Sequence, residues 1–212
     1  MTKTVLFDMD GTLVDTERYF RVYWPKAMAE FGFKMSDEQA LQMRSLGRPF
    51  APARLKEWFG DTVDYPAIRA RRTEMMEAVF AKEGLSLRPG AVEILKELKE
   101  RGIPASVVTA SPVERTERYL TMTGIREYFS RIISATEVQK GKPEPDVYLY
   151  ACRQLGLAPG DCVAIEDSPN GVLSAYRAGC KVIMVPDQSG VEEMLPYLYA
   201  WTPTLKEIGQ YV

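Results

Sequence analysis

Apolar runs that alternate with amphipathic helical segments restrict the fold of this chain more than any other feature of its sequence. From Leu87 to Val185, each run is followed by a helix-like stretch before the next run begins. Parallel strands joined in this way use right-handed helical crossovers, and several such units build a doubly wound parallel sheet. We therefore expect an α/β fold. The expected strands are residues 103–108, 131–134, 161–165 and 181–185, and the expected helices are residues 91–101, residues 145–155 and two segments that start at Ser111 and Ser168.

The first strand stands apart from this series. Val5-Leu6-Phe7 is a short apolar run that fits a buried parallel strand, and it ends in Asp8-Met9-Asp10-Gly11-Thr12. Residues 16–81 then carry aromatic, Met and Arg side chains at helical spacing, with four prolines and no strand pattern. We predict an α/β core of residues 1–15 and 82–212, interrupted after its first strand by a helical insertion of residues 16–81.

The composition excludes several classes of protein. Hydrophobic residues make up 46% and charged residues 26% of the 212 residues, so the chain is neither disordered nor fibrous. The net charge of −2 comes without a basic block, which argues against a nucleic-acid partner. The longest apolar run, residues 147–152, is far shorter than the ~20 residues of a membrane span, so no membrane partner is expected.

The expected localisation is cytoplasmic. A carboxylate, Asp8, precedes any apolar region long enough for a signal peptide. Cys152, Cys162 and Cys180 show no paired or metal-binding spacing, as in proteins of a reducing compartment.

The absence of histidine from the sequence limits the chemistry. It excludes Ser-His-Asp and Cys-His catalysis, phosphohistidine intermediates and zinc held by histidine. Any reaction must therefore use carboxylates, lysine, arginine and hydroxyl groups.

Two carboxylates follow the first strand. In open α/β sheets the ligand lies beyond the carboxyl ends of the strands, and Asp8 and Asp10, two residues apart, are expected to point the same way. One carboxylate can attack phosphorus directly, while the second transfers protons to a leaving group and from water. Gly11 permits a tight turn that would let substrate approach the backbone. An ordinary surface turn is the alternative interpretation.

Three further groups follow later strands or lie in a loop. Thr109 and Ser111 precede a helix N-terminus, where backbone N–H groups and a hydroxyl can bind an anion. The alternative is a capping box formed by Ser111 and Glu114. Lys142, flanked by Gly and Pro, can neutralise a phosphate and its nucleophile, although a lone loop lysine is usually solvated.

Glu166 and Asp167 follow another apolar run, where unpaired acids are costly. Asp8, Asp167 and a backbone carbonyl, together with waters and a phosphate oxygen, would suit an octahedral Mg²⁺ site. Several carboxylates that face a phosphate repel one another unless a divalent cation and Lys142 offset them. Alternatively, Asp167 only begins a turn before Ser168 caps the next helix.

The order of these motifs resembles that of the haloacid dehalogenase superfamily, in its phosphatase and β-phosphoglucomutase-like branch. The resemblance covers essentially the whole chain and implies a Rossmann-like core with an inserted α-helical cap. It rests on four segments, which are Asp8-Met9-Asp10-Gly11-Thr12, Thr109 after an apolar strand, Lys142 in Gly-Lys-Pro-Glu-Pro-Asp, and Glu166-Asp167-Ser168.

The resemblance also implies roles for these residues. Asp8 would be the nucleophile and Asp10 the general acid and base. The phosphoryl group would be held by Thr109, Ala110, Ser111 and Lys142. Mg²⁺ would be held by Asp8, the main-chain carbonyl of Asp10 and Asp167, with Glu166 beside it or behind it.

The chain departs from the β-phosphoglucomutase pattern in its insertion. Phe20 occupies the place of the hinge histidine that follows the Asp-Thr step of those mutases. Gly47 aligns with the mutase cap, but Phe50 stands where the phosphate-binding arginine is expected and Arg48 is displaced. We predict that Arg48 reaches the substrate from the cap, the alternative being an exposed side chain that covers apolar surface with its stem.

These observations lead to one main hypothesis and two alternatives. The chain is predicted to be a Mg²⁺-dependent phosphatase that hydrolyses a small phosphorylated metabolite, such as a sugar phosphate, through an aspartyl-phosphate. The first alternative is a sugar phosphomutase of the β-phosphoglucomutase type. The second is a non-enzymatic phosphoacceptor module, which Asp10 and the helical insertion disfavour.

Overall fold

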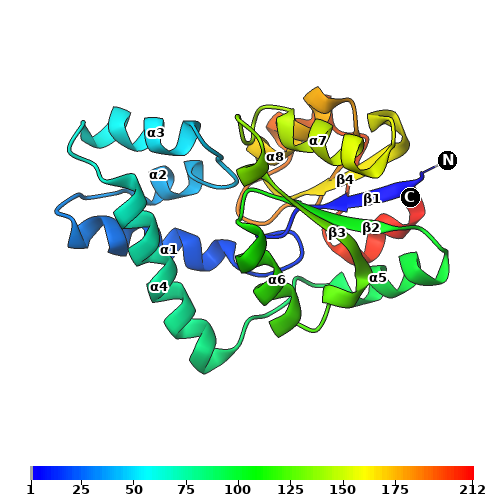
Figure 1. Ribbon diagram of the computed structural model, residues 1–212, viewed down its shortest axis with the longest axis horizontal. Coiled ribbons are helices and arrows are strands. Elements are labelled where there is room, and N and C mark those ends of the chain that lie inside the picture. The colour runs from blue at the N-terminus through cyan, green and yellow to red at the C-terminus, as the bar shows by residue number, and fades with distance from the viewer. Residues whose placement is uncertain (1) are drawn as a thin grey trace.

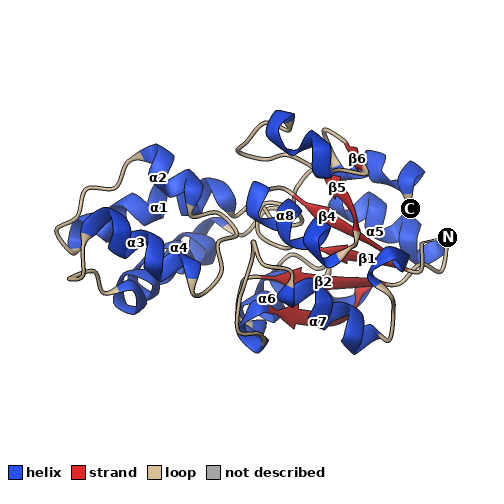
Figure 2. Ribbon diagram, turned by 90° about the horizontal axis from the view of Figure 1, so that it is seen from above, coloured by secondary structure: helices blue, strands red, loops and turns tan. Residues whose placement is uncertain are grey.

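The computed structural model describes residues 2–212, in which a sheet is covered by helices on both faces and extended at one end by a group of helices (Figures 1 and 2). All paired strands are parallel, in the order β3-β2-β1-β4-β5-β6. The strands are β1 (Thr4–Phe7), β2 (Ala105–Thr109), β3 (Phe129–Ser134), β4 (Cys162–Glu166), β5 (Lys181–Met184) and β6 (Ala200–Trp201).

The alternation of side chains along the strands builds two separate apolar layers. In β1, Val5 and Phe7 pack into one layer and Leu6 into the other. The first layer includes apolar residues of α5 (Ala91–Glu100) and α6 (Val113–Met122), and the second includes those of α7 (Asp146–Leu155) and α8 (Pro169–Ala178). Because both faces are covered, the central strands β1, β2 and β4 are buried along their whole length, as the sequence predicted.

Four helices are inserted between β1 and α5, and they lie apart from the sheet (Figure 2). We call this group the cap. Its members are α1 (Glu17–Glu30), α2 (Asp37–Gln42), α3 (Phe50–Phe59) and α4 (Tyr65–Glu83). The predicted α/β fold with a helical insertion after the first strand is therefore confirmed.

The two chain segments that connect the cap to the sheet lie side by side. Asp15 N donates a hydrogen bond of 2.9 Å to Ser86 O, and Val14 forms an antiparallel bridge with Leu87. The chain thus enters and leaves the cap at neighbouring positions. The cap faces the end of the sheet where β1, β2 and β4 terminate.

The elements that the sequence predicted differ from the structure mainly at their ends. The third strand starts at Phe129, two residues before the expected start, and β2 starts at Ala105, two residues after it. Ser168 caps α8, since its Oγ accepts a hydrogen bond of 3.3 Å from Gly171 N. No helix within residues 2–212 combines the length and the apolar character that a membrane crossing requires.

Candidate active site

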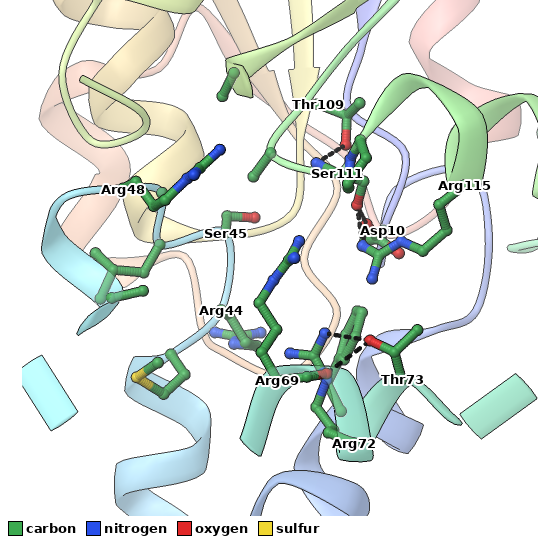
Figure 3. Close-up of a pocket in the computed structure, with 18 of the residues that line it drawn as sticks. Asp10, Arg44, Ser45, Arg48, Arg69, Arg72, Thr73, Thr109, Ser111 and Arg115 are labelled. Atoms are coloured by element: carbon green, nitrogen blue, oxygen red, sulfur yellow. Dashed lines mark hydrogen bonds and ion pairs between the residues drawn. The ribbon is translucent and has the colours of Figure 1, made fainter. Parts of the chain in front are cut away.

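The cap and the carboxyl ends of the strands enclose a cavity of about 580 Å³. Asp8 and Asp10 line it from the end of β1, and Thr109, Ala110 and Ser111 line it from the end of β2. The opposite wall comes from α1, α4 and the loop between α2 and α3, as Figure 3 shows for several of the polar side chains. Residues that the sequence widely separates therefore meet at one edge of the sheet.

Lys142 holds two of the carboxylates together behind this cavity. Its Nζ donates hydrogen bonds of 2.7 Å to Asp8 Oδ1 and 2.7 Å to Glu166 Oε1, and one of 3.2 Å to Val108 O. The Tyr148 hydroxyl donates a further hydrogen bond of 2.5 Å to Glu166 Oε1. Lys142 is fully buried, so it is not the solvated loop lysine of the alternative interpretation. Its direct contact with a phosphate stays a prediction.

Burial dominates the electrostatics of this group. It raises the pKa of Asp8 from 3.8 to about 7, even though Lys142 acts in the opposite direction. Burial and the neighbouring charges of Asp8 and Glu166 likewise raise the pKa of Asp167 well above its usual value. Although burial alone lowers the pKa of Lys142, the attraction of Asp8 and Glu166 outweighs it and raises that pKa above the usual range. The site has more buried negative charge than its own cations offset.

The surplus carboxylate oxygens fit a hard divalent cation. One oxygen each from Asp8, Glu166 and Asp167 lies within 4.8 Å of the others. Asp8 Oδ2, Glu166 Oε2 and Asp167 Oδ2 are buried without a hydrogen-bond partner. Gly171 leaves the space that Glu166 occupies, because a Cβ there would lie 1.9 Å from Glu166 Oε2. Unpaired oxygens gathered in this way are the ligands that Mg²⁺ prefers.

The Asp10 side chain is turned away from this cluster. Its Oδ1 accepts a hydrogen bond of 2.7 Å from Thr16 Oγ1, and its Oδ2 accepts bonds from Ser111 Oγ at 2.5 Å and from Arg115 at 3.2 Å. Three donors hold the carboxylate at the cavity wall. Only the main-chain carbonyl of Asp10 is left as a metal ligand, and that role stays a prediction.

Gly11 has the positive φ of +81° that a tight turn requires. The expected approach of substrate to its backbone stays a prediction, and on the side that a Cβ would occupy, side chains already fill the space. A Cβ on Gly11 would lie 2.5 Å from Asp167 Oδ2 and 2.6 Å from Glu17 Cγ. This glycine therefore lets the loop after β1 pack against the acidic cluster.

The capping box expected at Ser111 does not form. Helix α6 begins after Pro112 without a side-chain cap, and Ser111 Oγ donates instead to Asp10. A hydrogen bond to a buried carboxylate is stronger than one to a neutral backbone group, so Ser111 Oγ bonds to Asp10 rather than capping the helix. Ser111 N donates to Thr109 Oγ1 at 3.0 Å, which leaves the Thr109 hydroxyl proton available to an anion.

The cap contributes more charge to the cavity than the sequence indicated. Arg48 lines the cavity and is exposed, and its contact with the substrate stays a prediction. Phe20, which stands at the position of the mutase histidine, also lines it. Five charged side chains of the cavity were not predicted: Glu17, Arg44, Arg69 and Arg72 belong to the cap, and Arg115 lies on α6 of the core.

A loop of the cap is joined to the loop that carries Lys142. Gly47 N donates a hydrogen bond of 2.9 Å to Lys142 O, and Gly141 N donates one of 2.7 Å to Arg48 O. The backbones touch, since a Cβ on Gly47 would lie 2.6 Å from Gly141 Cα. Asn170 Nδ2 adds a bond of 2.9 Å to Arg44 O. We call these contacts the cap latch.

Comparisons with known proteins agree with this geometry. A family model described as a haloacid dehalogenase-like hydrolase matches residues 2–179. Hexitol phosphatase A of Escherichia coli K12 is 37% identical over 185 residues, which cover 86% of this chain and 82% of the relative. Validoxylamine A 7′-phosphate phosphatase of Streptomyces hygroscopicus subsp. limoneus is 33% identical over 189 residues, with 84% and 83% covered.

Solved structures share this fold. CbbY from Rhodobacter sphaeroides, solved with phosphate, superposes with a TM-score of 0.83 at 30% identity and covers 99% of this chain and 97% of its own. A mutant of CbbY solved with xylulose-1,5-bisphosphate gives a TM-score of 0.84 at 29% identity, with the same coverage.

Proposed function

The chain belongs to the haloacid dehalogenase-like hydrolases, in their phosphatase branch, and from this premise we propose that it hydrolyses a small phosphorylated metabolite by way of an aspartyl-phosphate on Asp8. The observation that carries the proposal is the state of the Asp8 carboxylate. Lys142 holds its Oδ1, while its Oδ2 has no partner at the end of β1 beside the cavity. The two oxygens of this carboxylate have more lone pairs than Lys142 uses, so Asp8 can both contribute to a cation site and attack phosphorus.

In the first step Asp8 attacks the phosphorus atom and the bond between phosphorus and the ester oxygen breaks. Asp10, which lines the same cavity, protonates the leaving oxygen. In the second step the Asp10 carboxylate takes a proton from water, and the water oxygen attacks phosphorus and releases Asp8. Hydrogen bonds from Thr16 and Ser111 orient the Asp10 carboxylate for this second role.

We propose that Mg²⁺ is held by Asp8 and Asp167, with the Asp10 carbonyl and with Glu166 close by. When bound, it offsets the negative charge of the phosphate and of the clustered carboxylates. The chain's own part is to place these oxygens together and to hold Asp8 and Glu166 with Lys142. Thr109, Ala110 and Ser111 then bind the phosphoryl oxygens at the end of β2.

The substrate that we propose is a phosphorylated sugar or polyol. The names of hexitol phosphatase A and validoxylamine A 7′-phosphate phosphatase support this class. The cap of residues 16–81 would close over such a substrate and exclude bulk water, with hinges near Asp15 and Ser86. We place the enzyme in the cytoplasm, which its three free buried thiols support.

A sugar phosphomutase remains a second candidate for one reason. A mutase must hold a second phosphate while its intermediate turns around, and the arginines of the cap wall supply cations for it. The test incubates the protein with β-glucose 1-phosphate, Mg²⁺ and catalytic bisphosphate and measures both products. We expect inorganic phosphate to form faster than glucose 6-phosphate. The reverse would replace the hydrolase by the mutase.

The direct test of the phosphatase is a phosphate-release screen over sugar, polyol and nucleotide phosphates, with Mg²⁺ and with excess chelator. We expect many turnovers on at least one sugar or polyol phosphate, and only when Mg²⁺ is present. Release limited to one equivalent would identify a phosphoacceptor instead.

A further inference from the structure

Tyr148 is a fully buried side chain that reaches the acidic cluster from behind, without lining the cavity. It lies in the first turn of α7 and packs in the second apolar layer, and its hydroxyl donates a hydrogen bond of 2.5 Å to Glu166 Oε1. Burial and the nearby charges of Glu166 and Asp8 raise the pKa of Tyr148 well above 10, so the hydroxyl keeps its proton. Any effect of Tyr148 on the reaction must pass through the residues that it touches.

Glu166 Oε1 accepts two hydrogen bonds, and Lys142 can supply only one of them. A lysine has three N–H donors, and those of Lys142 are used by Asp8 Oδ1, Glu166 Oε1 and Val108 O. The terminal torsion of a glutamate is broad, so a single bond leaves its carboxylate free to turn. The Tyr148 hydroxyl supplies the second bond from a rigid ring, whose centre also lies 5.4 Å from Lys142 Nζ.

The two hydrogen bonds leave the other oxygen of Glu166 unused. Glu166 Oε2 is buried without a partner, as are one oxygen of Asp8 and one of Asp167. Helix α8 confines the carboxylate on another side, because a Cβ on Gly171 would lie 1.9 Å from Glu166 Oε2. The carboxylate is therefore held in one orientation, and the lone pairs of Oε2 remain for a cation or for its bound water.

We propose that Tyr148 is a positioning residue of the candidate metal site, and that its hydroxyl fixes Glu166 so that the clustered carboxylates stay arranged for Mg²⁺ and Lys142 stays bonded to Asp8. This inference deepens the proposed function and rests on its magnesium site. Groups that orient the surroundings of a metal in this way typically contribute about 10- to 100-fold to metal affinity or activity. Tyr148 acts through Glu166 and Lys142, since its hydroxyl and its ring touch these two residues.

The first test is Mg²⁺ binding to Tyr148→Phe, measured by calorimetry without substrate. The variant loses only the hydroxyl group, and we expect its Kd for Mg²⁺ to rise about 10-fold. The matched control is Tyr119→Phe. Tyr119 is also fully buried and its hydroxyl donates to a carboxylate, that of Glu77 at 2.8 Å, but Glu77 lies outside the acidic cluster. The control should bind Mg²⁺ as the wild type does.

A double-mutant cycle separates positioning of Glu166 from packing of α7. In the Glu166→Ala variant the hydroxyl has no carboxylate to hold, so adding Tyr148→Phe should change the Kd for Mg²⁺ less than about 2-fold. A packing role would weaken binding equally in both backgrounds and would overturn the proposal. If Tyr148→Phe does not fold, or Glu166→Ala binds no Mg²⁺, Gly171→Ala decides. Its Cβ displaces the same carboxylate and should raise the Kd at least about 10-fold, and an unchanged Kd would overturn the proposal.

These measurements need no substrate, which keeps the proposal distinct from the phosphatase. Weaker Mg²⁺ binding by Tyr148→Phe, with wild-type binding by Tyr119→Phe, supports the positioning role even if no phosphate ester is hydrolysed. Such an outcome would count against the phosphatase alone. An unchanged Kd in folded Tyr148→Phe, an equal loss in Tyr119→Phe, or no Mg²⁺ binding by the wild type would each overturn the positioning role, and phosphate release would still test the phosphatase.

Discussion

The two walls of the cavity differ in their balance of positive and negative side chains. On the core wall, at the carboxyl ends of the strands, Lys142 bonds to two carboxylates, and the remaining carboxylate oxygens face one another. On the cap wall, Arg69 and Arg72 face the cavity without a carboxylate partner. The core side therefore has carboxylate oxygens that Lys142 leaves unpaired, whereas the cap side of the cavity carries four arginines against one carboxylate, Glu17.

This difference indicates a division of labour. On the proposed mechanism, the wall with surplus carboxylates would bind a cation and perform the phosphoryl transfer, whereas the wall with surplus guanidinium groups would contact the rest of the substrate. Substitutions on the core wall should then reduce kcat, and those on the cap wall should act mainly on KM and on the choice of substrate. The predictions that follow test this separation.

The largest effect is expected at Asp8. Asp8→Asn removes the attacking oxygen while keeping the size of the side chain, so kcat should fall at least about 10³-fold with the fold intact. Steady-state phosphate release and circular dichroism measure the two quantities. Asp61→Asn, at a carboxylate that is 95% exposed, is the matched control and should retain full activity. Activity of the Asp8 variant above a few per cent, after deamidation is excluded, would contradict the nucleophile.

The second largest effect is expected for Asp167→Ala. The variant loses one of three clustered carboxylates, and we expect Mg²⁺ affinity to fall at least about 10-fold. Activity as a function of Mg²⁺ concentration measures this shift, and excess EDTA should stop turnover of the wild type. Full turnover in EDTA would show that the core wall works without a cation.

Gly47→Ala tests how the two walls are joined. The added Cβ would lie 2.6 Å from Gly141 Cα and would push apart the loops of the cap latch, so kcat/KM should fall about 10-fold. Gly160→Ala is the matched control, because a Cβ there meets nothing within 4 Å. Equal kinetics in both variants would mean that the cap latch does not contribute to catalysis.

The smallest expected effect is on stability. The pKa of Asp8 is raised from 3.8 to about 7, so the folded chain binds this proton more tightly than the unfolded chain. Its contribution to stability is complete below about pH 4 and is lost as the pH rises to about 7. Over this range, the Tm of EDTA-treated wild type should decrease by several degrees relative to that of Asp8→Asn. If differential scanning calorimetry gave the same dependence of Tm on pH for both proteins, ionisation of Asp8 would not destabilise the folded chain.

The core wall was predictable from the sequence because its residues follow apolar runs. Thr109 and Glu166 end their strands and Asp8 directly follows β1, and parallel strands bring their carboxyl ends to one edge. The partners of these residues were less predictable. Ser111 bonds to Asp10 across 101 residues, while the local pattern favoured a helix cap.

The cap wall was largely missed, although one signal was present. The buried face of α4 is Ile68, Arg72, Met76 and Phe80, at intervals of four residues. An arginine within an apolar stripe is costly unless it is paired or binds a ligand, so Arg72 stood out by its spacing. Arg44 and Arg69 offered no such signal, since which side of a short helix or loop faces a cavity depends on how the cap packs on the core.

The central claim is that the core wall carries the phosphoryl group covalently on Asp8. Rapid acid quench during turnover, followed by peptide mass spectrometry, measures this directly. We predict one phosphoryl group on the peptide that contains Asp8, formed only with Mg²⁺ and absent from Asp8→Asn. A wild-type enzyme that turns over with no phosphorylated peptide at any quench time, or with the phosphoryl group on another residue, would contradict the account.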